Sequence, residues 1–369
     1  MPEIQIALTK KLATAMAIKP ETADESVNPI FCWTANWTNT FDGRKEDMVV
    51  MVNHATRFTV TIYGVKRNQF KYIEAKIIDA IEKTLLAMNL SRELVNDYLK
   101  QAGSITFTSN HDRKMTAQVN RQGLDAAFVV GRAVNERGGR LKFENTLGRT
   151  VSRRPVNYSN SHDTAFFPAD KMIGALSKLT GKPTYKYRAF ELLVTLNLEI
   201  YNATRRLIVC ADMDFQRLHE VLQEVFNWKN YHLFDFAVYD NKAGEPCAYL
   251  VPNEESLLYY DNAVLLNGCK LSEYLSMQSR IAYTYDMSAN WTHEIKLVRI
   301  IDEYRNDSPY LLEASGQTPP EDVGGIGGFI AFREIMLNPN HPEFADAKQW
   351  CGHWSPELRE WNTRPRFIY

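Results

Sequence analysis

The chain has 369 residues, of which 45% are hydrophobic and 24% charged, the proportions of an ordinary globular protein. Its 43 Lys and Arg residues balance 44 Asp and Glu residues, which excludes a whole-chain positive field that attracts nucleic acid. Because this length exceeds what one hydrophobic core usually organises, we expect two domains.

Cysteine usage and the N-terminal residues both indicate a soluble protein of the cytoplasm. The five cysteines are odd in number and form no Cys-x-x-Cys pair, so the sequence signals neither a disulfide framework nor a thiolate zinc site. The first residues lack the basic and apolar regions of a secretory signal, and no apolar run approaches the roughly 20 residues that span a bilayer. We therefore expect a cytoplasmic protein without a membrane partner.

The first domain is expected to cover residues 1–125 and to mix strands with helices. Ile73, Ile77, Ile81 and Leu85 recur every four residues, which predicts an amphipathic helix at 70–88. Ser91 is a suitable N-cap for a second helix at 92–101, and Gly103 is a suitable stop. Runs of apolar and β-branched residues predict strands at 48–52, 57–63 and 104–108.

Several short motifs of this first segment occur in a set order. They are Thr-Lys-Lys-Leu at 9–12, Asn53 with Thr-Arg-Phe at 56–58, and Asp112-Arg113 before Asn120. Together they resemble an uncharacterised domain family that opens with the Thr-Lys-Lys-Leu element. The resemblance covers about the first 120 residues. It implies an architecture and no activity, because that family has no assigned function.

Residues 126–184 are interpreted as a basic, irregular connector with one short helix at 171–179. Within 131–155 there are seven basic residues and two acidic ones, and glycines and a proline interrupt any regular period. One interpretation is an arm that binds nucleic-acid phosphates, and the alternative is a solvated linker. The residues of the candidate arm are Arg137, Arg140, Lys142, Arg149, Arg153 and Arg154.

The second domain is expected to cover residues 185–369. Strands are predicted at 190–200, 206–209 and 233–239, with a hairpin formed by 281–285 and 291–300. Helices are predicted after the N-cap Asp214 and at 270–275, 328–336 and 343–350. Since strands and helices mix without a regular βαβ repeat, the fold class is α+β, with two mixed domains joined by the connector.

The second domain carries an ordered set of motifs. Leu-His-Glu-Val-Leu-Gln stands at 218–223, and Tyr285-Asp286 precedes Trp291 and His293. Pro-Pro-Glu-Asp-Val-Gly-Gly stands at 319–325 and Asn-Pro-Asn-His-Pro-Glu at 338–343. The set resembles the plasmid pRiA4b ORF-3-like family, whose members occur on mobile genetic elements and are often labelled TnpR, a transposon resolvase. We find no helix-turn-helix and no nucleophile domain here, so the resolvase label is rejected.

The chain departs from that family at positions that bear on metal chemistry. Met-Ser-Ala-Asn at 287–290 replaces the usual Phe-Gly-Asp-Asp, which removes two carboxylates. Leu311 and Thr318 stand where relatives often have cysteines. These departures count against a metal site of the family's kind in this chain.

Two histidines and three carboxylates are the candidate functional groups. Strand alternation places His293 on the face of Trp291 and Ile295, and His232 on the face of Phe234. Each histidine is interpreted as a packed core residue, with a metal or proton-relay role beside Asp286 as the alternative. Glu321 and Asp322 offer hard oxygen ligands for a metal ion, although Pro-Pro-Glu-Asp is also ordinary helix-start chemistry.

These observations lead to one function hypothesis and two alternatives. The leading hypothesis is a non-enzymatic binding protein of a mobile element, which contacts a protein or nucleic acid through a groove and needs no cofactor. The groove candidates are His232, Asp286, Trp291, His293, Glu321 and Asp322. The first alternative is a metal-dependent hydrolase, such as a nuclease, with a divalent ion on Asp286, His293, Glu321 and Asp322. The second is a self-associating scaffold, and the oligomeric state stays open.

Overall fold

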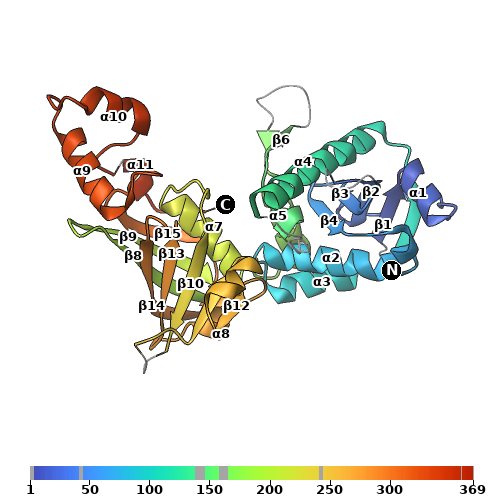
Figure 1. Cartoon of the computed structure of the whole chain (residues 1–369). Helices are drawn as coiled ribbons and strands as arrows, with labels where there is room; N and C mark the ends of the chain where they lie inside the picture. The colour runs from blue at the N-terminus through green and yellow to red at the C-terminus, as the bar shows by residue number, and fades with distance from the viewer. Residues whose placement is uncertain are drawn as a thin grey trace. The chain divides into compact units, whose positions relative to one another are not determined.

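The computed structural model describes residues 4–40, 45–137, 146–157, 165–240, 244–358 and 360–368. Its chain divides into two compact units, Met1–Lys186 and Tyr187–Tyr369. Each unit combines helices with a mixed sheet, which confirms the predicted α+β class (Figure 1).

The first unit is built on a five-stranded sheet in the order β4-β3-β2-β1-β5. β1 runs parallel to β2 and β5, whereas β2, β3 and β4 form antiparallel pairs. The strands are β1 (Ile4–Leu8), β2 (Cys32–Thr38), β3 (Met48–Asn53), β4 (Thr59–Tyr63) and β5 (Ile105–Ser109). A separate two-stranded ladder pairs β6 (Val156–Asn157) with β7 (Ala165–Phe166).

Helices cover both faces of this sheet. One core contains Val49 and Met51 together with residues of α2 (Ile73–Ala87), α3 (Arg92–Ala102) and α6 (Pro168–Thr180). The other contains Met48, Val50 and Val52 with residues of α4 (Arg113–Arg137) and α5 (Thr146–Ser152). Every residue of β3 is buried, as expected of an apolar run that is covered on both sides. The short α1 (Lys10–Met16) starts at the predicted Thr-Lys-Lys-Leu motif with Thr9 as its N-cap.

The segment 126–184 differs from the irregular connector that we expected. Its α6 contributes Met172 and Leu176 to one core of the first unit. Leu147 and Val151, both in α5, belong to the other core. The helix predicted at 171–179 corresponds to α6. In α5 a glycine and an arginine interrupt the apolar period, so its amphipathic pattern is weak in the sequence although the helix packs against the sheet.

The second unit is built on a nine-stranded sheet in the order β12-β11-β10-β13-β14-β8-β9-β15-β16. All neighbouring strands whose pairing is described run antiparallel except β11 and β12, which run parallel. The strands are β8 (Tyr187–Asn197), β9 (Asn202–Cys210), β10 (Phe234–Tyr239), β11 (Ala248–Val251), β12 (Ala263–Leu265), β13 (Arg280–Tyr285), β14 (Trp291–Tyr304), β15 (Tyr310–Ser315) and β16 (Arg366–Phe367). The predicted hairpin corresponds to β13 and β14, with Tyr283 opposite His293.

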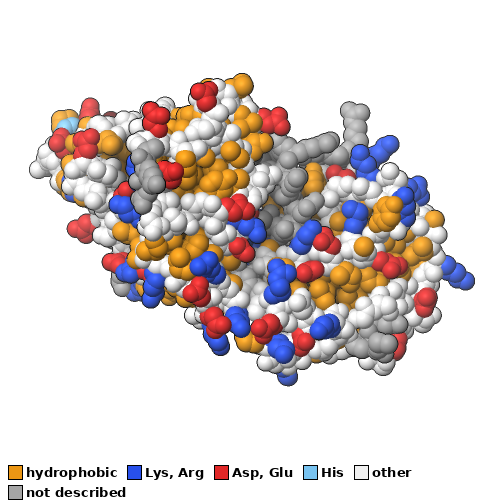
Figure 2. All heavy atoms as spheres, turned by 90° about the horizontal axis from the view of Figure 1, so that it is seen from below, with side chains coloured by type: hydrophobic (Ala, Val, Ile, Leu, Met, Phe, Trp, Pro, Cys, Tyr) orange, Lys and Arg blue, Asp and Glu red, His pale blue; other side chains and the backbone are white. Residues whose placement is uncertain are grey.

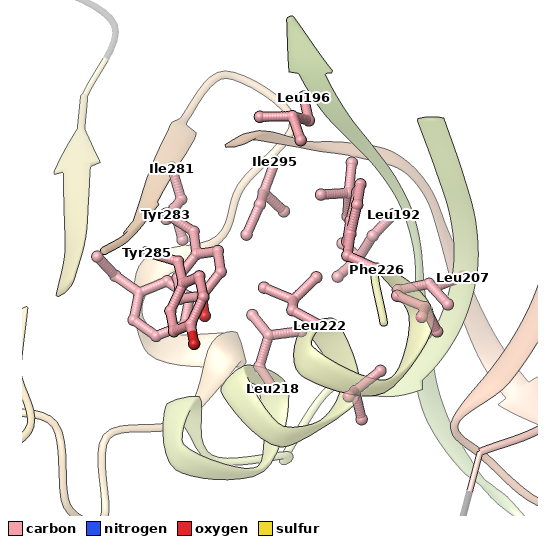
Figure 3. Close-up of a cluster of buried hydrophobic side chains, with 14 of the residues drawn as sticks. Leu192, Leu196, Leu207, Leu218, Leu222, Phe226, Ile281, Tyr283, Tyr285 and Ile295 are labelled. Atoms are coloured by element: carbon pink, nitrogen blue, oxygen red, sulfur yellow. The ribbon is translucent and has the colours of Figure 1, made fainter. Parts of the chain in front are cut away.

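One face of this sheet packs against α7 (Phe215–Val225), which Asp214 caps by accepting a bond from the Arg217 N–H. Leu218 and Leu222 of α7 point toward Ile281, Tyr283 and Ile295 of the sheet (Figure 3). The remaining helices are α8 (Leu271–Tyr274), α9 (Gly325–Leu337), α10 (Phe344–Cys351) and α11 (Glu360–Thr363). The alternation along β13 and β14 therefore places the tyrosines and His293 inside the core.

The surface carries charge of both signs. Figure 2 shows Lys and Arg side chains intermingled with Asp and Glu over the face in view, as the near-zero net charge predicts. None of the described helices combines the length and the apolar character that are required to cross a bilayer. Individual large apolar side chains are exposed, such as Leu258 and Tyr231, which is normal for a protein surface.

Candidate functional site

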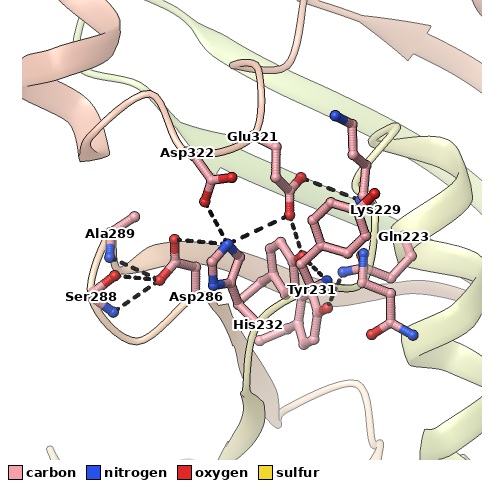
Figure 4. Close-up of polar contacts among 12 residues, drawn as sticks. Gln223, Lys229, Tyr231, His232, Asp286, Ser288, Ala289, Glu321 and Asp322 are labelled. Carbon is pink, nitrogen blue, oxygen red and sulfur yellow. Dashed lines mark hydrogen bonds and ion pairs between the residues drawn. The ribbon is translucent and has the colours of Figure 1, made fainter. Parts of the chain in front are cut away.

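Four polar side chains of the second unit meet where β10 begins and β13 ends (Figure 4). They are His232, Asp286, Glu321 and Asp322, and they come from three separate segments of the chain. His232 Nε2 lies 2.8 Å from Asp322 Oδ1, 3.8 Å from Asp286 Oδ2 and 4.0 Å from Glu321 Oε1. We call these four residues the His232 cluster. One imidazole thus faces three carboxylates.

The backbone turn after β13 fixes the position of Asp286. This residue has a φ of +57°, in the left-handed region that Asp tolerates better than most residues. Its Oδ1 accepts bonds from Ser288 N (3.1 Å), Ser288 Oγ (2.6 Å) and Ala289 N (3.2 Å), so Oδ2 faces His232. Burial raises the pKa of Asp286, but the Ser288 and Ala289 bonds and the nearby imidazole outweigh it, so the pKa is lowered overall. The Asp286 carboxylate is therefore negatively charged and lies beside the His232 imidazole.

Glu321 is the most enclosed carboxylate of the cluster, with a side chain that is only 3% exposed. Its Oε1 accepts a bond from the Tyr285 hydroxyl, and its Oε2 accepts one from Lys229 N at 3.2 Å. Burial raises the pKa of Glu321 above its ordinary value even though both bonds favour the charged form. A raised pKa of this kind is typical of carboxyl groups at functional sites.

Asp322 opens the cluster to solvent, because its side chain is 60% exposed while that of His232 is 29% exposed. Ligand atoms of His232, Asp286 and Asp322 all lie within 4.8 Å of one another, a spacing that one cation can bridge. One imidazole nitrogen and two carboxylate oxygens form a mixed donor set that suits Zn²⁺ or Mn²⁺ better than a soft metal. The exposed side leaves room for water or a ligand in the remaining positions.

His293 and Trp291 lie in the core, apart from this cluster. His293 is fully buried, and the Trp228 Nε1–H donates to its Nε2 at 3.4 Å. Its Nδ1 therefore carries the proton and donates to the Tyr283 carbonyl oxygen at 3.2 Å. Burial lowers the pKa of His293 to about 4, so the ring is neutral. With both nitrogens engaged, His293 has no lone pair for a metal ion, and Trp291 packs beside it against Trp228.

Comparison with known proteins places both units. A profile of the plasmid pRiA4b ORF-3-like proteins matches residues 188–363. An uncharacterised protein, y4hQ of Sinorhizobium fredii (strain NBRC 101917 / NGR234), is 36% identical over 172 residues, which are 44% of this chain and 79% of that protein. The chain belongs to the plasmid pRiA4b ORF-3-like family. The resemblance seen in the sequence motifs is thereby confirmed, and we call Tyr187–Tyr369 the ORF-3-like unit.

Two further matches complete the comparison. A domain of unknown function, DUF6933, matches residues 5–171, which confirms the resemblance of the first unit to an uncharacterised family. A crystal structure of a protein of unknown function from Methanosarcina mazei Go1 is similar, with 26% identity and a TM-score of 0.43. That match covers 48% of this chain and 97% of the other.

The ORF-3-like unit also contains functional candidates that the sequence analysis missed. The Tyr285 hydroxyl donates to Glu321 and accepts a bond from Tyr231 N at 2.9 Å, so it joins the loop before β10 to the loop before α9. Ser288 holds Asp286 in place. Tyr285 could have been identified from the sequence, because it precedes Asp286 in the family motif and stands at the end of a predicted strand, where functional side chains often lie.

A pocket of about 640 Å³ adjoins the His232 cluster in the ORF-3-like unit. Glu321 and Asp322 form part of its wall, and Lys229 lies on the same wall. Trp350, Trp354 and Arg366 contribute side chains from the C-terminal part of the chain. Pockets that bind small molecules have volumes of roughly 300–1,000 Å³, so this one is large enough for an organic ligand. It adjoins the carboxylates that face His232.

The glycines of the Pro-Pro-Glu-Asp-Val-Gly-Gly motif have structural roles at the start of α9. Gly324 and Gly325 have φ angles of +89° and +71°, which glycine adopts without strain. A Cβ at Gly328 would lie only 2.0 Å from the carbonyl oxygen of Val323. Backbone geometry accounts for Gly324, Gly325 and the following Gly328.

The candidate basic arm falls partly outside the structure. Arg140 and Lys142 lie outside the described residues, as does the side chain of Arg137. Arg149 belongs to α5, and Arg153 and Arg154 follow it directly. These three are half-buried residues of the first unit, so they belong to a packed helix and the turn after it.

Proposed function

We propose that the ORF-3-like unit is a non-enzymatic binding module that holds a divalent cation at His232, Asp286 and Asp322. The cation would complete a recognition site for a partner in the adjoining pocket. One observation carries the proposal, the convergence of one imidazole and three carboxylates from three chain segments. Without a cation, three carboxylates around one histidine repel one another, and a cation removes that repulsion.

The direct test is metal binding by the full-length protein. Zn²⁺, Mn²⁺ and Mg²⁺ are titrated separately by calorimetry, with thermal unfolding as a second readout. We expect one ion per chain for at least one of these metals and a higher melting temperature in its presence. The variants His232→Gln and Asp322→Asn should each weaken binding by at least tenfold.

Asp302→Asn is the matched control, because Asp302 is an exposed aspartate of β14 with a side chain that is 81% exposed. It should bind metal like the unchanged protein. Absence of binding for all three ions, with the unchanged protein folded, would overturn the proposal. Equal loss in Asp302→Asn and Asp322→Asn would overturn it as well, because the effect would not depend on the cluster.

A metal-dependent hydrolase is the second candidate, and Glu321 favours it. Its raised pKa and its position 4.0 Å from His232 Nε2 suit a general base that takes a proton from a metal-activated water. The test is a screen of phosphodiester substrates with the bound metal. Activity that is lost in Glu321→Gln while metal stays bound would favour hydrolysis over binding alone.

The family name supports an association with mobile DNA, which belongs to this proposal as well. Relatives are named after a plasmid reading frame. The partner would then be a protein or a nucleic acid of the element. The self-associating scaffold receives less support, because self-association requires no convergence of polar groups such as the His232 cluster.

A further inference from the structure

The pocket beside the His232 cluster has an aromatic wall. Trp350 is 53% exposed, and its ring meets Phe332 edge-on with 5.6 Å between centroids. Trp354 is fixed more firmly, since its Nε1–H donates to the Thr318 carbonyl oxygen at 2.8 Å and its ring packs against Phe332 and Phe329. Exposed indole rings on a fixed support are platforms on which planar ligands stack.

The floor of the same pocket carries a buried positive charge. Arg205 is only 2% exposed, and its five hydrogen bonds go to neutral oxygens, among them Val225 O at 2.7 Å, Ser315 O at 3.0 Å and Thr318 Oγ1 at 3.1 Å. Among the described residues no carboxylate forms an ion pair with it. Burial and the nearby Arg366 both lower the pKa of Arg205, to about 10. An anion in the pocket would relieve the repulsion between these two guanidinium groups.

Part of the pocket lining is acidic, and it sets a condition on any anionic ligand. Glu321 and Asp322 line the pocket, and Glu224 lies near Arg366. Without a cation at the His232 cluster these carboxylates repel a phosphate. With a cation there, the wall and Lys229 attract one. The ligand that fits both walls has a planar aromatic part and a phosphate.

We propose that this pocket binds a nucleotide, with the base against Trp350 and Trp354 and the phosphate toward the basic side chains. The inference rests on the proposed metal site, which supplies part of the phosphate binding. The nucleotide comes either free or as the phosphorylated end of a single strand. Both sources present the same base and phosphate, so the experiment must separate them.

The test is calorimetric titration of the full-length protein with adenosine monophosphate and with a 5′-phosphorylated single-stranded DNA octamer. Each is titrated with and without Mn²⁺, and adenosine and inorganic phosphate serve as the two halves of the ligand. We expect nucleotide binding that is at least tenfold tighter with Mn²⁺. Similar affinity for the two probes indicates a free nucleotide, and tighter binding of the octamer indicates a strand end.

Three variants locate the site. Trp350→Ala should weaken nucleotide binding by at least tenfold and leave phosphate binding unchanged, because only stacking is lost. Lys229→Ala, at an exposed position, should weaken binding of every phosphorylated probe. Tyr259→Ala is the control, since Tyr259 is 66% exposed and lies outside the pocket lining. Unchanged melting temperatures show that each variant is folded.

Failure of this inference can be told apart from failure of the metal site. If Mn²⁺ binds at the His232 cluster and neither nucleotide probe binds, the nucleotide inference is overturned and the metal site stands. If Trp350→Ala binds each probe as tightly as the unchanged protein does, the aromatic wall has no role and the inference is likewise overturned. If none of Zn²⁺, Mn²⁺ and Mg²⁺ binds, the metal site is overturned, and the nucleotide inference, which rests on it, is overturned as well.

Discussion

Two histidines of the ORF-3-like unit, His232 before β10 and His293 in β14, have opposite surroundings. His293 is enclosed by aromatic rings, and both of its nitrogens are bonded to neutral groups. His232 is partly exposed and faces three carboxylates. Strand alternation predicted an apolar face for both residues, but His232 precedes β10 and lies outside the strand, so only His293 lies on such a face. The difference shows that a histidine's role depends on whether its nitrogens meet neutral donors and acceptors or charged ligands.

The largest effect should come from removing the buried ring. His293→Ala leaves a cavity in the aromatic core and an unbonded Trp228 Nε1–H, and we expect a loss of about 3–5 kcal/mol in the free energy of unfolding. Urea unfolding followed by tryptophan fluorescence measures it. His232→Ala, the comparison variant, should lose less than about 1 kcal/mol. Equal losses in the two variants would break the contrast between the histidines.

Acid should destabilise the protein through His293. The unfolded residue titrates near pH 6.5, whereas burial lowers the pKa of the folded residue to about 4. Between these values the unfolded chain binds a proton that the folded chain does not, so stability is complete above pH 6.5 and falls as pH falls toward 4. The loss should be roughly 3 kcal/mol.

The same urea experiment at several pH values, with His293→Gln and His232→Gln in parallel, isolates this contribution. The pH dependence should become shallower in His293→Gln, because that variant lacks the imidazole that takes up a proton on unfolding. A steep acid dependence that persists in His293→Gln would assign the effect to other groups.

Substitutions of Asp286 test the surroundings of His232, the partly exposed histidine of the comparison. Asp286→Ala removes three hydrogen bonds from a left-handed turn and should cost about 2 kcal/mol of unfolding free energy. Asp286→Asn keeps a side-chain acceptor and tolerance of the turn, so it should cost less than about 1 kcal/mol. Thermal unfolding of both variants measures the difference. Equal melting temperatures of Asp286→Ala, Asp286→Asn and the unchanged protein would show that the turn does not depend on this side chain.

A smaller effect than that of Asp286→Ala is expected from Tyr285→Phe. This change removes the hydroxyl that donates to Glu321 and that accepts from Tyr231 N. Because that bond favours the charged carboxylate, its loss should raise the pKa of Glu321 further, with a stability change of about 1 kcal/mol. A carboxyl-carbon NMR titration follows the pKa directly. A lowered pKa would contradict this account of the cluster.

Local patterns in the sequence predicted much of the fold. The four-residue period of Ile73, Ile77 and Ile81 corresponds to α2, and the apolar runs at 48–52 and 233–239 correspond to β3 and β10. The helix predicted at 171–179 corresponds to α6, but α5 was missed because an arginine and a glycine interrupt its apolar period, while its Leu147 and Val151 pack against a distant strand. Such packing overrides weak local signals.

The candidate site was predictable only in part, because its contacts join distant segments. Asp286, Glu321 and Asp322 were identified from motifs, but His232 and Asp322 are 90 residues apart, and nothing local pairs them. The Trp228 bond that satisfies His293 spans 65 residues. The sequence showed which residues have the chemistry, whereas only the fold shows which of the two histidines faces carboxylates.

Asp286 and Asp322 share a backbone feature, a positive φ of +57° and +61°. Each position must therefore satisfy two demands, a left-handed conformation and a carboxylate, and aspartate meets both. A single nucleotide change converts an aspartate codon into an asparagine codon, which keeps the conformation and removes the charge. Descendants of this chain could thus lose the proposed metal site in one mutational step while the fold persists, so an intact fold in a relative is a poor guide to whether that site is retained.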